Sequence, residues 1–211
     1  MSAPVAEGPG PGSGLEELAV VLRSGGVVAL PTDTVYGLAA DASDPRAAER
    51  VFALKGRPES VALPVLVADL EQAALLVERA SHAALAALAR SFWPGALTVV
   101  APRAAGARLE LGGDGATVGV RCPAHGSVRS LCGLVGPLAV TSANRHGGPP
   151  CTSADEVRVV FGAALPVLDG GSCSGAPSTV VSLDRESGAR LLRSGPVPLR
   201  EVLEVLGAAS R

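Results

Sequence analysis

Residues 26–38 read GVVALPTDTVYGL, and this stretch decides how the chain begins to fold. Its first five residues form an apolar run closed by Pro31, which is typical of a short strand buried on both faces. Two threonine hydroxyls, the Asp33 carboxylate and the only tyrosine, Tyr36, follow directly. A turn with a buried tyrosine would explain these residues, and so would a binding site at the end of a strand in an α/β sheet.

Working outward from this stretch, helices and strands alternate. Residues 15–22 repeat apolar side chains at helical spacing after a capping box at 13–16. Asp44 is a good N-cap before Pro45, and it opens a helix that ends at Lys55. We expect further strands at 64–67, 96–101, 117–121, 137–141, 178–183 and 190–193, and further helices at 70–79, 82–92, 127–132, 153–161 and 198–206.

Length and composition suit one compact α/β domain, or two small lobes that share a core. The chain has 211 residues, 47% of them hydrophobic. Residues 1–12 are rich in Gly, Pro and Ala without periodicity, so we expect a disordered leader before a domain at 13–211. The four cysteines form no C-x-x-C pair, no apolar run reaches the ~18 to 20 residues of a membrane span, and no signal peptide is visible. We therefore expect a cytoplasmic protein with no membrane partner.

Charge and aromatic content argue against strong direct binding of nucleic acid. The net charge is −2, so the chain lacks the bulk basic field that holds RNA or DNA. Only five aromatic residues are present, which argues against stacking platforms for bases.

Lys55 is the only lysine among 18 basic residues, and it stands two positions before Arg57. A chain that uses arginine almost everywhere has kept a compact ammonium here, which indicates a phosphate-binding role. The alternative is that Gly56 ends a helix and that the two cations only complement the helix dipole.

Polar residues also gather where several of the expected strands end. Arg121 closes one strand, the run 141–144 follows another, and Arg193 closes the last. Taken alone, the run 141–144 could be an N-cap or an Asx-turn. Together with the stretches 169–171 and 177–181, these residues supply cations and hydroxyls, which suits an anionic ligand such as a nucleotide. No P-loop or Rossmann glycine motif is present, which excludes conventional enzymes of those two classes.

Six ordered motifs resemble those of the YrdC-like family of threonylcarbamoyl-AMP synthases, over roughly residues 15–205. They are PTDTVYGL at 31–38, KGRP at 55–58, SAN at 142–144, DGG at 169–171, PSTVV at 177–181 and R-x-G at 193–195. The resemblance implies a twisted, open, mixed α/β sheet flanked by helices, with a concave, positively lined cavity. It also implies a nucleotidyltransferase that condenses L-threonine, bicarbonate and ATP, with Mg²⁺, to threonylcarbamoyl-AMP and pyrophosphate. The product would pass to a tRNA-modifying transferase complex that forms threonylcarbamoyladenosine.

The resemblance assigns roles to individual residues of this chain. Lys55 and Arg57 would be catalytic and would hold the ATP phosphates. The other ATP-binding residues would be Thr117, Ser142, Asn144, Cys151 and Arg193. Threonine would be held by Thr34, Arg121, Thr141 and Ser178, with Tyr36 as a wall of its pocket. No metal site built by protein side chains is implied.

Three places depart from the family pattern. Val61-Ala62-Leu63 stands where many relatives have Asn-Pro-Leu or Lys-Pro-Leu, Leu66 replaces a histidine, and Cys151 replaces a serine. Each change removes a polar side chain from the expected site, so contacts there are absent or come from the backbone.

Other classes of function remain open from the sequence. The run 171–175 mimics a nucleophile elbow with Cys173 at its centre, although it lacks the strand and helix that normally flank one. Cys122 and His125 supply only two ligands, too few for a zinc site. A YrdC-like fold could also serve as an RNA-binding or ribosome-maturation protein without synthase activity, or as a carbamoyl-transfer domain of hydrogenase maturation.

Overall fold

The computed structural model describes residues 13–56, 60–173, 175–184 and 188–209. Eight strands form one sheet in the order β1-β2-β6-β3-β5-β4-β7-β8. The pairs β3/β5 and β4/β7 are parallel, whereas the other neighbouring pairs are antiparallel. The strands are β1 (Val28–Leu30), β2 (Gly37–Asp41), β3 (Val65–Leu66), β4 (Leu97–Pro102), β5 (Thr117–Arg121), β6 (Leu138–Ser142), β7 (Thr179–Asp184) and β8 (Gly188–Arg193).

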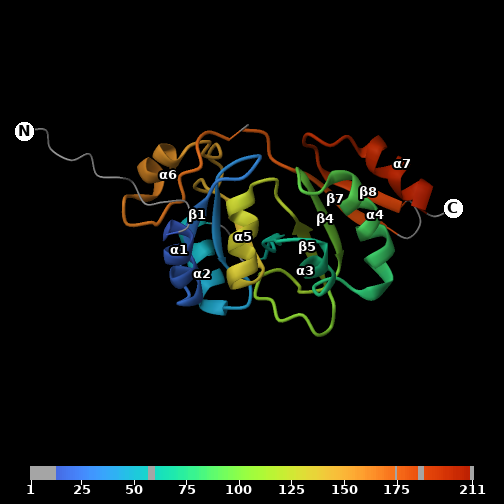
Figure 1. Ribbon diagram of the computed structural model, residues 1–211, viewed down its shortest axis with the longest axis horizontal. Coiled ribbons are helices and arrows are strands. Elements are labelled where there is room, and N and C mark those ends of the chain that lie inside the picture. The colour runs from blue at the N-terminus through green and yellow to red at the C-terminus, as the bar shows by residue number, and fades with distance from the viewer. Residues whose placement is uncertain (1–12, 57–59, 174, 185–187, 210–211) are drawn as a thin grey trace, which may run out of the picture.

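Helices flank both ends of this sheet. In Figure 1, α1, α2 and α5 gather around β1, whereas α4 and α7 lie at the opposite end beside β4, β7 and β8. The helices are α1 (Ser13–Arg23), α2 (Pro45–Lys55), α3 (Leu70–Ala74), α4 (His82–Phe92), α5 (Gly126–Val135), α6 (Ala154–Phe161) and α7 (Leu199–Ala209), with a 3₁₀ turn at Arg79–Ser81. Among the described residues, no helix combines the length and apolarity that crossing a bilayer requires.

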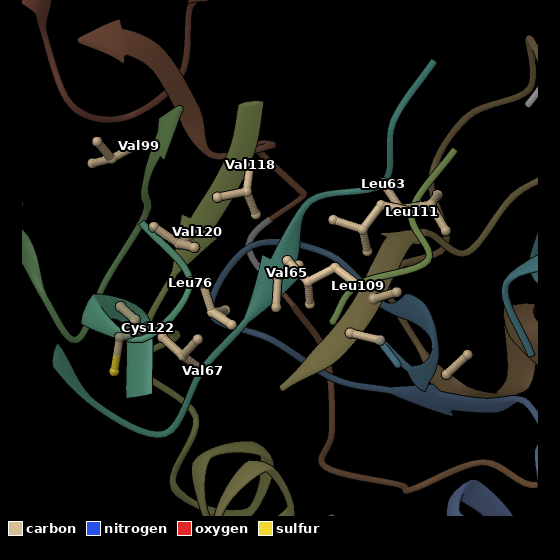
Figure 2. Packing of buried hydrophobic residues seen from close by; sticks show 14 of the residues in the cluster. Leu63, Val65, Val67, Leu76, Val99, Leu109, Leu111, Val118, Val120 and Cys122 are labelled. Carbon is tan, nitrogen blue, oxygen red and sulfur yellow. The ribbon is translucent and has the colours of Figure 1, made fainter. Parts of the chain in front are cut away.

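One face of the sheet is covered by a continuous aliphatic core (Figure 2). Val65, Val99, Val118 and Val120 project into it from the central strands and are almost completely buried. Because cross-strand partners share a face, the pairs Val65 with Val120 and Val120 with Val99 place all of these side chains on one side. Residues of α2, α4, α6 and α7 complete the core.

The other face is covered over only part of its width. A second cluster packs α1 and α5 against β1, β2, β6 and β3, with Leu22, Leu131 and Val140 among its members. On this same face β5, β4 and β7 present Gly119, Thr98 and other residues that have no helix above them. The uncovered part of the sheet is therefore where a ligand can approach.

All of the expected strands are present, and the sheet contains one further strand that was not predicted. No strand was expected between Pro31 and Asp44, whereas β2 lies there and pairs with β1 and with β6. Its Gly-Leu-Ala-Ala-Asp sequence lacks the β-branched residues that mark strands. The helix predicted over 70–79 ends at Ala74. The Ser13 capping side chain and the leader at 1–12 lie outside the described residues.

The ends of α2 follow the predicted capping pattern. The Asp44 side chain accepts a hydrogen bond from the backbone N–H of Arg46 at 2.9 Å, and Pro45 occupies the first turn. Gly56 has a φ of 66° and its N–H bonds back to the carbonyl of Phe52, which ends the helix directly after Lys55. Local sequence thus fixes where the only lysine is presented.

Replacing Gly56 by alanine tests this capping role. A Cβ at Gly56 would meet nothing within 4 Å, so the cost is backbone strain alone, and we expect Gly56→Ala to lower the free energy of unfolding by about 1 kcal/mol. Gly133→Ala is the matched control, because Gly133 lies inside α5 without a positive φ and should gain up to about 1 kcal/mol. Urea denaturation measures the free energy of unfolding of both variants, and equal changes in the two would contradict the capping role of Gly56.

Candidate functional site

A cavity of about 670 Å³ lies over the uncovered part of the sheet. Its floor includes Leu66, Thr98, Val100, Gly119 and Val180, which come from four strands that are neighbours in the sheet. A methyl group at Gly119 would lie 3.4 Å from a methyl of Val100, so the absence of a side chain at Gly119 leaves space above the middle of the floor. The cavity therefore crosses the face of the sheet, and is not confined to the carboxyl ends of its strands as expected from parallel α/β sheets.

Two groups of polar side chains lie at this cavity, and all of their members except Asp33 line it. The lysine cluster consists of Lys55, Ser142 and Asn144, at the end of α2 and the end of β6. The arginine cluster lies where the β1–β2 loop meets the ends of β4, β5, β7 and β8, and it consists of Asp33, Thr34, Thr98, Arg121, Ser178 and Arg193. Because β6 is antiparallel to β3 and β3 is parallel to β5, the ends of β6 and β5 point in opposite directions.

The Lys55 ammonium is directed across the fold toward β6. Its Nζ donates to the carbonyl oxygen of Ser142 at 2.6 Å and to the Ser142 hydroxyl at 3.0 Å, and it makes a very short contact with Asn144 Oδ1. The Asn144 side-chain amide is itself fixed, because it donates to the carbonyls of Arg145 and Gly148. Only 5% of Lys55 is exposed, so it is a buried cation at the cavity wall. A lysine that only complemented a helix dipole could stay on the surface, so its burial favours a role in the cavity.

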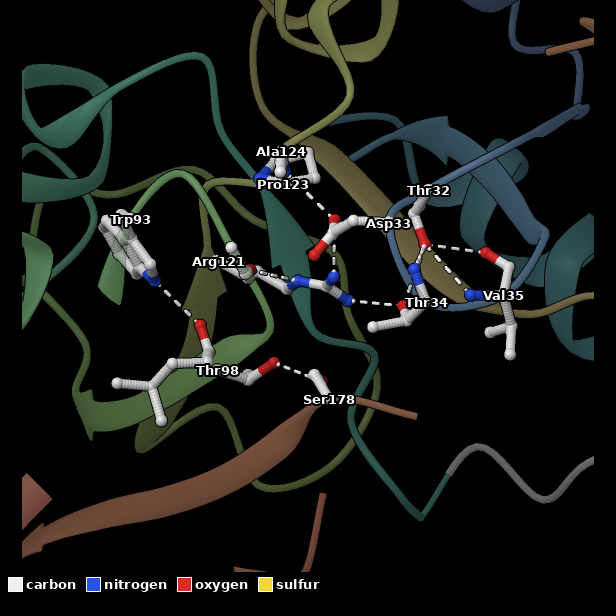
Figure 3. Close-up of polar contacts among 12 residues, drawn as sticks. Thr32, Asp33, Thr34, Val35, Trp93, Thr98, Arg121, Pro123, Ala124 and Ser178 are labelled. Atoms are coloured by element: carbon white, nitrogen blue, oxygen red, sulfur yellow. Dashed lines mark hydrogen bonds and ion pairs between the residues drawn. The ribbon is translucent and has the colours of Figure 1, made fainter. Parts of the chain in front are cut away.

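Arg121 is held from three directions (Figure 3). Its Nε donates to the carbonyl of Gly95 at 2.9 Å, Nη1 to the Thr34 hydroxyl at 2.9 Å and Nη2 to Asp33 Oδ1 at 2.7 Å. Burial lowers the pKa of the Arg121 guanidinium, and the Asp33 carboxylate opposes that shift. Within the described chain these bonds use three of the five guanidinium N–H groups, so one on each terminal nitrogen is left for a ligand.

Ser178 joins the second arginine to the same cluster. Arg193 Nε donates to the Ser178 carbonyl and Nη2 to the Ser178 hydroxyl, both at 3.0 Å. An irregularity in the β7–β8 register, between Val180 and Val181, pairs Arg193 with Val180 and so turns it to the cavity face. Burial and the nearby charge of Arg121 both lower the pKa of Arg193. Two guanidinium groups thus share one end of the cavity, which favours an anion there.

Most of the residues that the sequence singled out meet in this cavity. Nine of the predicted ligand-binding residues line it: Thr34, Lys55, Thr117, Arg121, Thr141, Ser142, Asn144, Ser178 and Arg193. Arg57 lies outside the described residues. Val61, Ala62 and Leu66 also line the cavity, so two of the three places that depart from the family pattern contribute apolar wall.

The structure does not bring Tyr36 or Cys151 to the cavity, contrary to the sequence prediction. Val35 and Gly37 line it, so the alternation of side chains turns Tyr36 to the opposite face, where it is 0% exposed. The Tyr36 hydroxyl donates to the carbonyl of Gly171 at 2.8 Å and accepts from the N–H of Gly170 at 3.2 Å. Cys151 is buried, and its backbone bonds to Tyr36 and Ala143. Both residues support the cavity wall from behind.

Sequence reasoning missed Thr98 and His146, which both line the cavity. Thr98 had a detectable signal. In the strand 96–101, Leu97, Val99 and Ala101 alternate toward the core, so the polar residue between them must face the other way. For His146, whose backbone N–H bonds to the carbonyl of Lys55, nothing in the sequence marked the position.

Comparison with known proteins shows which family has this fold. A family model for Sua5, YciO and YrdC proteins, described as telomere recombination, matches residues 20–195. The chain belongs to the Sua5/YciO/YrdC family. A putative threonylcarbamoyl-AMP synthase of Mycobacterium leprae is 39% identical over 196 residues, which are 92% of this chain and 88% of that protein.

A solved relative shares the fold closely. The structure of Pyrococcus abyssi Sua5 complexed with L-threonine matches this Sua5/YciO/YrdC chain with a TM-score of 0.82 and 39% identity, over 92% of this chain and 57% of that one. This chain therefore spans little more than half of the Pyrococcus protein. Escherichia coli YciO matches with a TM-score of 0.76 at 22% identity, over 88% of this chain and 91% of that one, and it supports the fold alone. The predicted mixed sheet with flanking helices is confirmed.

The thiol and metal alternatives gain no support. Burial raises the pKa of the Cys173 thiol, whereas a reactive cysteine needs a lowered one. Across residues 13–56, 60–173, 175–184 and 188–209, no group of three or more His, Cys, Asp or Glu side chains is placed to hold a metal ion.

Asp33 should be important for stability, because it offsets the buried charge of Arg121. We expect Asp33→Asn to lower the free energy of unfolding by roughly 2–3 kcal/mol, less than for a fully buried pair because the Asp33 side chain is 20% exposed. The control is Asp155→Asn, which breaks the exposed ion pair with Arg158 and should change stability by less than about 1 kcal/mol. Chemical denaturation measures both, and a Asp33→Asn variant as stable as the control would refute the argument.

Cys173 should be dispensable for activity in this family member. We expect Cys173→Ala to keep the turnover of the wild-type chain within about twofold, because a thiol with a raised pKa is mostly protonated near neutral pH. The measurement is the rate at which each variant forms the adenylate product in the assay described under the proposed function. A loss of about 100-fold or more, with folding intact, would instead favour the nucleophile-elbow interpretation.

Proposed function

We propose that this chain is a threonylcarbamoyl-AMP synthase, a nucleotidyltransferase that condenses L-threonine, bicarbonate and ATP. The observation that carries the proposal is that one cavity holds both a buried ammonium and a pair of guanidinium groups, in separate clusters. Synthase names among relatives at about 40% identity, and a relative solved with L-threonine, support the choice of reaction.

In this proposal the arginine cluster holds the amino acid. A carboxylate only accepts hydrogen bonds. Arg121 lines the cavity, and two of its N–H groups make no hydrogen bond to the described residues, so they can donate to a carboxylate. The hydroxyls of Thr34, Thr141 and Ser178 also line the cavity and would bind the carboxylate and the threonine hydroxyl. Asp33 keeps Arg121 oriented without itself being needed as a ligand.

The lysine cluster then holds the phosphates of ATP. The Lys55 ammonium has three donors, and phosphate oxygens can replace the oxygens of Ser142 and Asn144 that it contacts now. Mg²⁺ would arrive as part of the substrate Mg-ATP, bound mostly by the phosphates and water. The Ser142 hydroxyl and Asn144 amide oxygens fit such an ion because it prefers oxygen ligands, and its charge would lower the barrier to attack on phosphorus.

The reaction follows from bringing the two clusters' ligands together. The threonine amine attacks bicarbonate, which gives a carbamate and water, or it attacks the CO2 formed by dehydration of bicarbonate, which gives a carbamate and a proton. A carbamate oxygen then attacks the α-phosphorus, and the bond to pyrophosphate breaks. Both partners are anionic, so the cations of Lys55, Arg121 and Arg193 reduce their repulsion, and a shared cavity removes much of the entropic cost of assembly.

The product would leave for a second enzyme. Threonylcarbamoyl-AMP is a reactive mixed anhydride, so we propose that a tRNA-modifying transferase complex in the cytoplasm consumes it to make threonylcarbamoyladenosine. The net charge of −2 fits a protein that makes the activated group and leaves tRNA binding to that complex.

The direct experiment supplies Mg-ATP, L-threonine and labelled bicarbonate, and measures labelled threonylcarbamoyl-AMP and threonine-dependent pyrophosphate release. We expect Lys55→Ala to reduce turnover by at least about 100-fold. Lys55→Arg should fail similarly, because a planar guanidinium cannot replace a compact ammonium in a site that is 5% exposed.

Arg90→Ala is the matched control, since it removes one positive charge from an exposed position near the end of α4. Its turnover should equal that of the wild-type chain. Absence of labelled product from the wild-type chain, or equal turnover in Lys55→Ala and Arg90→Ala, would overturn the proposal. RNA binding without product would then favour the non-enzymatic alternative.

A further inference from the structure

Thr98 occupies a position that the proposed reaction does not yet explain. It is the second residue of β4, and its neighbours Leu97 and Val99 are fully buried in the core on the opposite face. Thr98 faces the cavity and is itself buried. Its hydroxyl lies 2.8 Å from the hydroxyl of Ser178, and Figure 3 shows this contact between Thr98 on β4 and Ser178 directly before β7.

The proton arrangement around Ser178 can be worked out from its partners. A serine hydroxyl has one proton to donate and two lone pairs that accept. Arg193 must be the donor in its bond to Ser178 Oγ, because a guanidinium has no acceptor, so one lone pair is taken. The remaining question is whether Thr98 donates to Ser178 or Ser178 donates to Thr98.

An anionic ligand selects one direction. Within the described part of the chain, the Thr98 hydroxyl has no hydrogen-bond partner other than Ser178. Both hydroxyls are buried and both line the cavity, so either arrangement leaves one of the two protons for the cavity. If Ser178 is the donor, it presents a lone pair to an anion beside Arg193, which is repulsive. If Thr98 is the donor, both lone pairs of Ser178 are filled and the Ser178 proton is left to point into the cavity.

We propose that Thr98 is a positioning residue: by donating to Ser178, it directs the Ser178 proton toward the carboxylate of the bound amino acid. This inference rests on the proposed function, because it takes the anion at the arginine cluster to be the threonine carboxylate. A carboxylate is purely an acceptor, so it needs a proton and not a lone pair from Ser178. Thr98 makes that polarity possible, because it can donate the proton that fills the second lone pair of Ser178.

The test is a double-mutant cycle on threonine affinity. Thr98→Val has nearly the same shape but no hydroxyl, and we expect it to raise the dissociation constant for L-threonine about tenfold while leaving that for ATP unchanged within about twofold. Thr98→Ser restores the hydroxyl and should recover most of the affinity. Ser178→Ala should weaken threonine binding at least as much, and adding Thr98→Val to it should weaken binding no further, because Thr98 acts only through Ser178.

Titration calorimetry on the full chain provides these constants, and thermal unfolding checks that each variant is folded. If Thr98→Val does not fold, Thr98→Ala takes its place in the cycle. Additive effects of the two substitutions, or equal affinity of Thr98→Val and wild type, would overturn the proposal while the synthase reaction stands. If the wild-type chain binds no threonine, the proposed function fails first and this inference fails with it.

Discussion

Arg121 carries a full positive charge at a position where only 6% of the residue is exposed. Such a charge is tolerated only when it is paired and hydrogen-bonded. Its partners come from the β1–β2 loop and from the turn at Gly95, which lie far apart in the sequence. Satisfying this one guanidinium therefore fixes where the loop carrying Thr34 sits relative to β4 and β5, and with it one end of the cavity.

The second constraint is the unequal covering of the sheet. Two helices, α1 and α5, shield one face only as far as β3, and the strands beyond it supply the cavity floor. Because most neighbouring strands are antiparallel, polar residues that end different strands are distributed to opposite ends of this floor. That geometry separates the Lys55 cluster from the Arg121 cluster. Two anionic substrates can therefore be bound at separate cationic groups before they react.

Sequence alone predicted much of this arrangement where the signal was local. The N-cap at Asp44, the end of α2 at Lys55 and the bounds of β5 depend on neighbouring residues, and they were predicted correctly. β2 was missed because its pairing with β6 is a long-range contact that overrides weak strand propensity. Tyr36 was placed in the ligand pocket by the family resemblance, although alternation with Val35 and Gly37 turns it away. The convergence of Thr98, Ser178 and Arg193 depends on strand order and on the irregular β7–β8 register, which no local pattern encodes.

The central claim is that one cavity binds the amino acid at its arginine cluster and the nucleotide phosphates at its lysine cluster. A crystal structure of the chain with L-threonine and a non-hydrolysable ATP analogue tests it most directly. The account predicts the threonine carboxylate within hydrogen-bond distance of Arg121 and Ser178, and phosphate oxygens within hydrogen-bond distance of Lys55 Nζ. Density for the amino acid beside Lys55, for phosphates beside Arg121 and Asp33, or for either ligand outside the cavity would contradict it.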